Sequence, residues 1–350
     1  MKTLFTSDYC EGALPRIIER LTQTNMVQTV GYGEDEYCAQ ARELIKAACA
    51  CPDADVHFLV GGTQTNATVI SSILRPYQGV LCAETGHINV HETGAIEHGG
   101  HKVLGLPSPD GKITAAQIGD ALDGHFSDAN HEHTVMPGMV YISFSTESGT
   151  IYTREELTAI SEVCRSFGIP LFVDGARLGY GMAASELIYG SEALTLKDFA
   201  RLADVFYIGG TKQGALFGEA VVITNDALKE DFRYCIKQGG GMLAKGRLLG
   251  IQFAALFEDG LYMDASRGAV RQAARIRKAF EYKRIGFMVD SPTNQVFPIL
   301  TEAQAETMDK DFGFEVWQRL PDGKVAVRFC TSWATPETNV DKLIQAIHNL

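Results

Sequence analysis

The chain has 350 residues, of which 45% are hydrophobic, and it carries a formal net charge of −12. This length accommodates one large domain or two, and the apolar fraction is sufficient for substantial buried cores. The negative charge argues against nucleic acid or an anionic membrane surface as a partner.

The predicted location is the cytoplasm. The N-terminal residues MKTLFTSDYCEG lack the apolar core of a signal peptide, and no stretch of the sequence is long and apolar enough to span a bilayer. The eight cysteines are scattered and include no C-x-x-C pair. We therefore expect reduced thiols in a cytoplasmic protein.

Helix and strand patterns alternate along the first 225 residues. Residues 36–50 and 65–75 are predicted helices, and a buried strand is expected near 139–144. A further helix begins at a capping box formed by Thr153 and Glu156 and stops at Gly168. Three strands follow, in the strings IPLFVD, DVFYIG and GEAVVIT. This alternation predicts an α/β fold with a mainly parallel sheet covered on both faces.

The C-terminal part has a different organisation. From about residue 227 a helical region continues through KQGGG to about residue 283, and residues 284–350 mix short strands with a last helix at 337–349. We predict a large domain over residues 1–255, which includes the N-terminal segment, and a smaller α+β domain over residues 256–350.

Lys212 and Asp174 suggest the chemistry. Asp174 ends the apolar strand IPLFVD, and Lys212 follows the apolar run Val205–Ile208 and a Gly-Gly pair. A lysine amine can hold pyridoxal phosphate (PLP) as a Schiff base, and a carboxylate can pair with the protonated ring nitrogen of that cofactor. The two strand ends therefore predict a PLP-dependent enzyme.

A phosphate site is predicted in LVGGTQTNATVISS, which reads as a strand, a glycine turn and a helix start. Free amides at a helix N-terminus bind phosphate groups. Gly62 and Thr63 are assigned to the PLP phosphate, with Gly61 and Asn66 supporting the turn. The alternative is an ordinary turn between a strand and a helix.

These strings together resemble the L-threonine aldolases, within the β-eliminating lyase group of fold type I PLP enzymes. The resemblance runs through TSDYCEGALP, VGYGED, GGTQTNAT, GHINVHETGA, FVDGAR, GGTKQG, KQGGGM and VRFCTSW. It implies an aspartate aminotransferase-like large domain and a homodimer or homotetramer with active sites at the dimer interface. The implied reaction cleaves L-threonine or L-allo-threonine to glycine and an aldehyde by breaking the Cα–Cβ bond.

The resemblance also implies roles for further residues. Ser7, Arg177 and Arg328 would anchor the substrate carboxylate, for which the planar fork of arginine is suited. Tyr32 and Glu34 would contribute to the site across a dimer interface, and Lys237 would provide charge for the partner's phosphate. A structural ion pair is the alternative for either arginine.

Four histidines lie close together, at positions 87, 91, 98 and 101. The spacing of His87 and His91 would suit zinc on a helix, but no glutamate lies between them and no third ligand is evident, so no metal is predicted. By the resemblance, His87, five positions before Glu92, would stack on the cofactor ring. The other three are expected on a helix surface.

One departure from the family concerns the catalytic base. The aldolases carry an N-T-H-N-type string whose histidine lies near the substrate hydroxyl, whereas this chain has Ser145, Thr146, Glu147 and Ser148 there. Glu147, His87 or a bound water could accept the proton, and burial would have to raise the pKa of Glu147 for that role.

Three functions stay open at this point. The first is the aldol lyase, acting on threonine or on a related β-hydroxy amino acid. The second is another fold type I PLP enzyme, a β-eliminating lyase or an aminotransferase. The third is a non-catalytic small-molecule or phosphate-binding protein, against which the presence of Lys212, Asp174 and both arginines argues.

Overall fold

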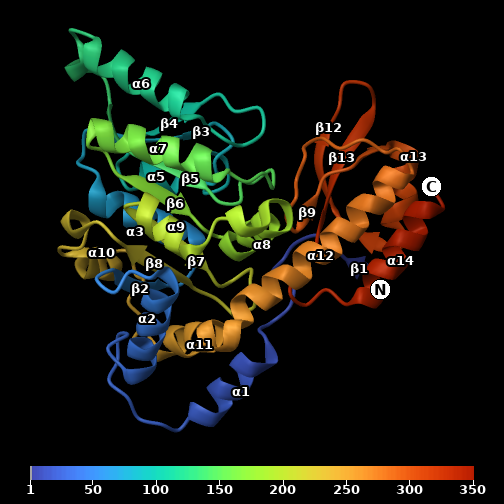
Figure 1. The fold of residues 1–350 in the computed structure, drawn as a ribbon, viewed down its shortest axis with the longest axis horizontal. Coiled ribbons are helices and arrows are strands. Elements are labelled where there is room, and N and C mark those ends of the chain that lie inside the picture. The colour runs from blue at the N-terminus through green and yellow to red at the C-terminus, as the bar shows by residue number, and fades with distance from the viewer. Residues whose placement is uncertain (1) are drawn as a thin grey trace.

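The computed structural model describes residues 2–350. Its centre is a seven-stranded sheet in the order β2-β8-β7-β6-β5-β3-β4 (Figure 1). The strands are β2 Asp55–Leu59, β3 Gln78–Ala83, β4 Val103–Leu106, β5 Met136–Ser143, β6 Leu171–Asp174, β7 Val205–Gly209 and β8 Glu219–Ile223. Neighbouring strands are parallel except at β8, which runs antiparallel to both β2 and β7. The predicted α/β class with a mainly parallel sheet is confirmed.

Helices cover both faces of this sheet, because side chains alternate along its buried strands. On β7, Phe206 and Ile208 join a core with α2, α7, α9 and α11, whereas Val205 and Tyr207 join a second core with α3, α5 and α10. The helices up to this point of the chain are α1 Pro15–Thr24, α2 Glu36–Cys49, α3 Gly62–Ile73, α4 His87–Val90, α5 Ala95–His98, α6 Ala115–Ser127, α7 Arg154–Phe167, α8 Leu178–Tyr189, α9 Leu196–Leu202, α10 Phe232–Gln238 and α11 Arg247–Phe257.

The local start and stop signals in the sequence coincide with real helix ends. Thr153 and Glu156 form the capping box of α7, and Gly168 ends that helix in the left-handed conformation with φ 65°. The helix predicted at 65–75 begins earlier, at Gly62, and ends at Ile73. Its N-cap residue is Gly61, which has no side chain to cap the helix. This shift brings Gly62 and Thr63 into the first turn of α3.

A smaller α+β unit follows the long helix α12, which connects the two parts of the molecule (Figure 1). Strand β13 pairs antiparallel with β9, β10 and β12, and β11 pairs with the N-terminal strand β1. These elements are β1 Thr3–Leu4, β9 Gln295–Val296, β10 Ile299–Thr301, β11 Phe312–Gly313, β12 Glu315–Arg319, β13 Lys324–Cys330, α12 Leu261–Tyr282, α13 Glu302–Asp309 and α14 Glu337–His348.

The N-terminal segment packs on this smaller unit, and both chain ends lie on that side of the molecule (Figure 1). Phe5 is buried in the small core with Phe312 and Phe329. This differs from the predicted placement of the segment in the large domain, because pairing with β11 links residues that are remote in sequence. Helix α12 contributes to both cores, so a boundary at residues 255 and 256 stays a prediction.

None of the helices within residues 2–350 combines the length and apolar character that a membrane crossing requires.

Candidate active site

The ends of β5, β6 and β7 lie side by side in the middle of the sheet. Ser143 at the end of β5 is in register with Asp174 at the end of β6. Lys212 follows the end of β7 by three residues. Since parallel strands end at the same edge of a sheet, the chain brings these two strand ends and the lysine turn together.

The Asp174 carboxylate is buried and surrounded by donors. Its Oδ1 accepts hydrogen bonds from the Tyr207 hydroxyl at 2.5 Å and the Ala176 amide at 2.9 Å. Its Oδ2 accepts from the Tyr141 hydroxyl at 2.5 Å and from Asn66 at 2.9 Å. Burial works to raise the pKa of Asp174, but the charge of His87 and these hydrogen bonds hold it below its usual value. The carboxylate is therefore ionised at neutral pH.

Strand alternation explains why both tyrosines reach the same carboxylate. Tyr141 and Tyr207 belong to the core on the α3 face of the sheet. Helix α3 contributes Asn66 from that face, and Gly62 lies so close that a Cβ atom there would be 3.2 Å from the Tyr207 hydroxyl. The first turn of α3 and Asp174 thus belong to one packed cluster.

The turn that carries Lys212 is held by a second buried acid, Glu219. Its Oε2 accepts from the Gly210 amide at 3.1 Å, and its Oε1 accepts from the Thr211 hydroxyl at 3.0 Å. The Tyr180 hydroxyl donates to the Lys212 carbonyl at 2.6 Å. Burial and then the nearby Arg177 charge lower the pKa of the Lys212 amine, with carboxylates opposing them. Burial raises the pKa of Glu219 to about 8, against the opposing charge of Lys212.

His87 begins the short helix α4, and its ring is oriented by Glu92. The His87 Nδ1 lies 2.8 Å from Glu92 Oε1, which also accepts a hydrogen bond from Asn66 at 2.8 Å. Burial would lower the pKa of His87, but the Glu92 hydrogen bond and the Asp174 charge leave it raised. Asn66 therefore connects His87, through Glu92, with Asp174.

Glu147 lies beside His87. Its Oε1 accepts from the His87 amide at 3.0 Å and from the Ser143 hydroxyl at 2.7 Å, while Oε2 is buried without a hydrogen-bond partner within residues 2–350. Burial raises the pKa of this carboxyl. The structure thus meets the condition under which Glu147 was named as a candidate base.

The remaining histidines differ from one another. His91 lies next to His87, with ring centroids 5.6 Å apart, and His98 is exposed. His101 is buried, and its Nδ1 lies 3.2 Å from the Gln78 carbonyl, so the expected helix-surface position is wrong for this residue. Within residues 2–350 no three His, Cys, Asp or Glu side chains are grouped to hold a metal ion.

Both arginines make ion pairs, which was the alternative that the sequence left open. Arg177 Nε and Nη2 donate to the two oxygens of Asp8 at 2.7 and 3.0 Å. Arg328 donates to Gln295 at 3.0 Å, to the Thr6 carbonyl at 3.1 Å and to Glu315. Ser7 lies in the chain between Thr6 and Asp8, and its hydroxyl is 3.2 Å from the Cys10 sulfur.

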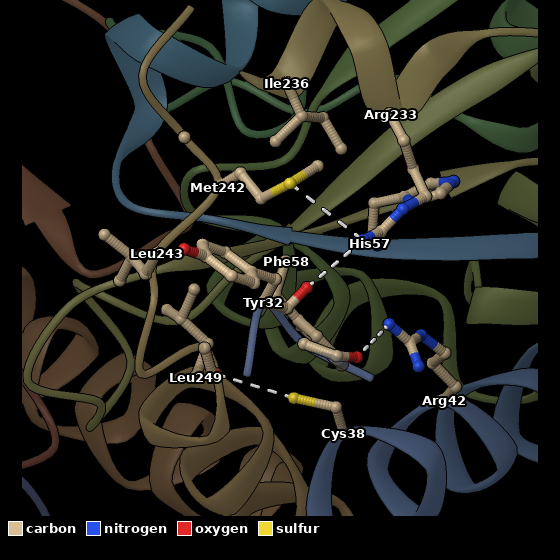
Figure 2. A pocket seen from close by; sticks show the side chains of 13 residues that line it. Tyr32, Cys38, Arg42, His57, Phe58, Arg233, Ile236, Met242, Leu243 and Leu249 are labelled. Carbon is tan, nitrogen blue, oxygen red and sulfur yellow. Dashed lines mark hydrogen bonds between the residues drawn. The ribbon is translucent and has the colours of Figure 1, made fainter. Parts of the chain in front are cut away.

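Tyr32 lies in a separate loop on the surface, shown in Figure 2. Its backbone has the left-handed φ of 62°, and 47% of the residue is exposed. Arg233 donates to the Tyr32 carbonyl at 3.3 Å, and Arg42 donates to the Gly33 carbonyl at 2.6 Å (Figure 2). Arg233 also pairs with Glu34 at 2.7 Å. Tyr32 and the two arginines also line a cavity of about 30 Å³.

Lys237 lies in the last turn of α10, next to the Tyr32 loop. Its Nζ lies 5.0 Å from the centre of the Tyr32 ring. Within residues 2–350, no hydrogen bond connects Tyr32 or Lys237 to Lys212 or Asp174. The chain therefore presents these two predicted site residues at its surface.

Several contributors to the cluster were not predicted from sequence, among them Asp8, Glu92, Tyr141, Tyr207 and Glu219. Asp8 lies next to Ser7 and Glu92 lies in the string that identified His87, so each stood beside a usable signal. The partners of Tyr207 and Glu219 become apparent only when the strands are paired.

The groups present fit PLP: a lysine amine with a lowered pKa, an ionised carboxylate for the ring nitrogen, and the helix N-terminus at Gly62 and Thr63 for the phosphate. The asparagine and tyrosine hydrogen bonds keep the carboxylate in place.

Comparison with known proteins agrees with this chemistry. The sequence model of the family described as Beta-eliminating lyase matches residues 5–303. A low specificity L-threonine aldolase from Pseudomonas sp. (strain NCIMB 10558) is 31% identical over 97% of this chain and 95% of that protein. The corresponding enzyme of Saccharomyces cerevisiae is 25% identical over 85% of this chain and 74% of its own length.

Solved structures show the same relationship. A threonine aldolase from Leishmania major has a TM-score of 0.95 and 44% identity, over 99% of both chains. An aspartate aminotransferase variant from Thermus thermophilus, with a TM-score of 0.68 and 12% identity over 99% of this chain and 91% of that one, shares the fold. The chain therefore belongs to the β-eliminating lyase family of PLP-dependent fold type I enzymes, among the threonine aldolases.

Proposed function

We propose that this protein is an aldol lyase that cleaves L-threonine, L-allo-threonine or a related β-hydroxy-α-amino acid to glycine and an aldehyde. The observation that carries the proposal is the grouping of Lys212, Asp174 and Arg177 at adjacent strand ends, in a chain 31% identical to a low specificity L-threonine aldolase. An amino acid is the substrate class.

The cofactor would be held by residues of one protomer's sheet edge. Lys212 would bind it covalently, Asp174 would keep its ring nitrogen protonated, and the ring of His87 would lie against its plane. Gly62 and Thr63 would bind its phosphate through the free amides of α3. When bound, PLP withdraws electrons from the substrate Cα, which lowers the barrier to breaking a bond at that atom.

The chain's own residues would select which bond breaks. Arg177, with Arg328 and Ser7, would hold the substrate carboxylate and so fix the rotation about the bond between Cα and the nitrogen. Only a bond perpendicular to the cofactor plane can release its electrons into the ring system. Cα–Cβ cleavage therefore requires a carboxylate held in one place.

Removal of the β-hydroxyl proton would fall to Glu147, with His87 or a bound water as the alternatives. Glu147 has a buried Oε2 without a protein partner within residues 2–350, and burial raises its pKa above that of an ordinary glutamate, as a general base requires. Its hydrogen bonds to Ser143 and the His87 amide keep the other oxygen fixed.

A cytoplasmic homodimer or homotetramer is proposed as the working form. Tyr32, Glu34 and Lys237 would complete the site of a partner subunit, with Lys237 near its phosphate and Tyr32 near its substrate. The exposure of Tyr32 and the hydrogen bonds from Arg233 and Arg42 to the backbone of its loop support a shared site, because an exposed loop held by side-chain hydrogen bonds can contribute to another chain.

The test is a coupled assay of purified, PLP-loaded protein with L-threonine and with L-allo-threonine, in which aldehyde and glycine are counted together. Equal amounts of the two products are expected. Ammonia with a keto acid would instead indicate elimination, and a keto acid with aminated cofactor would indicate transamination.

Lys212→Ala serves as the control in the same assay, with an expected loss of about a thousandfold or more. A second readout is independent of activity. Borohydride reduction of the wild type is expected to leave a phosphopyridoxyl group on the peptide containing Lys212 and on no peptide of the variant. Unchanged turnover in Lys212→Ala would refute the assignment.

A further inference from the structure

The N-terminal strap, residues 5–14, runs from the small unit to the start of α1 (Figure 1), and its end is hydrogen-bonded to the turn that carries Lys212. At one end the Phe5 carbonyl accepts a hydrogen bond from the Cys330 amide at 2.8 Å, and at the other the Leu14 amide donates to the Gly214 carbonyl at 2.8 Å. Between these anchors lies Asp8, which is fully buried. The proposed function gives this carboxylate no role.

Asp8 is bound side-on by Arg177. The guanidinium uses its Nε–H and one Nη2–H for the two oxygens of Asp8, at 2.7 and 3.0 Å. Arginine has five N–H donors in one plane, so three remain, two on Nη1 and one on Nη2. Within residues 2–350 no other acceptor binds this guanidinium. The pair therefore leaves one edge of Arg177 available to a second carboxylate.

The strap also binds the second arginine. The Thr6 carbonyl accepts from Arg328 Nη2 at 3.1 Å, and Arg328 is further engaged by Gln295 and Glu315. Positions 6 and 8 of the strap thus hold the two guanidinium groups, and Ser7 lies between them. One short segment sets how the three proposed carboxylate-binding residues are arranged.

Asp8 itself has a fixed orientation and charge. A third donor, Asn294 of the small unit, reaches its Oδ2 at 2.9 Å. Burial would raise the pKa of Asp8, but the Arg177 and Lys212 charges and these hydrogen bonds lower it. The carboxylate stays ionised, so its pairing with Arg177 persists at neutral pH.

We propose that Asp8 is a positioning residue, which holds Arg177 so that the free edge of its guanidinium binds the α-carboxylate of the amino-acid substrate. This inference rests on the proposed function for the identity of that carboxylate. Positioning and competition make opposite predictions. If Asp8 positions Arg177, its loss weakens substrate binding, and if it only competes for Arg177, its loss strengthens binding.

The experiment measures glycine binding to PLP-loaded protein by titration calorimetry, because glycine carries the carboxylate and has no Cα–Cβ bond to break. Asp8→Asn keeps the size of the side chain and removes its charge. We expect the Kd of glycine to rise about tenfold or more, since the bidentate charged contact that orients Arg177 is lost. Asp8→Glu keeps the charge but moves it by one methylene, and a severalfold rise is expected.

Asp198→Asn is the matched control. Asp198 is a largely buried carboxylate bound by Arg154 and by Thr195 at the start of α9, away from the Lys212 turn. This variant is expected to lose stability and to bind glycine as the wild type does. A merely structural role for Asp8 would give the same result in Asp8→Asn.

An unchanged or lower Kd in either folded Asp8 variant would overturn the proposal. Asp8→Glu retains the buried charge, so it supplies the answer if Asp8→Asn does not fold. Glycine binding does not depend on threonine cleavage. If the wild type binds glycine but releases no aldehyde from any β-hydroxy-α-amino acid tested, the proposed function is refuted. The effect of Asp8 on glycine binding can still be measured in that case.

Discussion

In this site, the protonation state of each carboxyl group depends on whether its buried oxygens have hydrogen-bond donors. Asp174 stays ionised because two phenols, an amide and Asn66 donate to it, whereas Glu147 has a buried oxygen without a donor. The two carboxyl groups therefore have pKa values shifted in opposite directions. Such a separation suits Asp174 to a permanent charge and Glu147 to proton transfer.

Glu147→Gln tests this division. If Glu147 is the base, kcat should fall by about a hundredfold or more, and the rise of wild-type activity with pH should disappear. That rise should lie above the ordinary glutamate value of 4.5, because burial raises the pKa and the active form is deprotonated. A pH–rate profile of both proteins provides the measurement, and a wild-type profile in the variant would point to His87 or water.

The same variant has a stability signature. A carboxyl whose pKa is raised by folding contributes stability at low pH, and this contribution is lost as pH rises through the folded-state pKa. Glutamine cannot ionise, so Glu147→Gln should not share that loss. The melting temperatures of the wild type and of Glu147→Gln should therefore be similar at acid pH, and that of the variant should be higher at mildly alkaline pH. Thermal melts of both proteins at the two pH values provide the measurement.

At the scale of elements, local signals in the sequence place the helices that frame the sheet. The capping box of α7 satisfies two backbone amides, with Thr153 accepting from the Glu156 amide at 3.2 Å and Glu156 accepting from the Thr153 amide at 2.8 Å. Helix α7 packs Leu157, Ile160 and Cys164 into the larger core, remote from the Lys212 turn in sequence. Its cap should matter for stability and not for catalysis.

Thr153→Ala should lower the free energy of unfolding by about 1 kcal/mol, because one amide of the first turn loses its acceptor. Denaturant titration gives the value, and Thr153→Ser, which keeps the hydroxyl, should recover most of it. The kcat and KM of Thr153→Ala should match the wild type. A changed KM would mean that α7 transmits strain to the site.

At the scale of the whole molecule, the proposed sharing of sites between subunits explains why Tyr32 and Lys237 lie outside the buried cluster of their own chain. Arg42 and Arg233 donate hydrogen bonds to the backbone of the Tyr32 loop (Figure 2), and Tyr32 is 47% exposed. A residue fixed in this way can serve a neighbouring chain only if the chains associate.

Mixing two defective subunits tests this arrangement. Lys212→Ala lacks the cofactor-binding amine and Tyr32→Ala lacks the proposed donor to the partner's site. In a mixed dimer one site has both residues intact, so co-expression should restore roughly a quarter of wild-type activity under random pairing. Activity no greater than that of the two variants measured apart would show that each site is complete within one chain.

The sequence by itself determined the α/β class, the strands β5, β6, β7 and β8, and the groups that follow β6 and β7, whereas β3 and β4 were not predicted. A buried strand, the turn after it and a helix cap are local features. The positions of Asp174 and Lys212 at strand ends and the α7 capping box could therefore be predicted without knowing any long-range contact. The family resemblance added His87 and the arginines from their strings.

Only the tertiary structure decided which of those groups meet and what holds them. Asp8 and Arg177 are 169 positions apart, and Asn294 is 286 positions from Asp8. Strand order in the sheet places Tyr141 and Tyr207 on either side of Asp174, and the pairing of β1 with β11 carries the strap to the small unit. Such contacts depend on packing between distant segments, and no local spacing in the sequence encodes them.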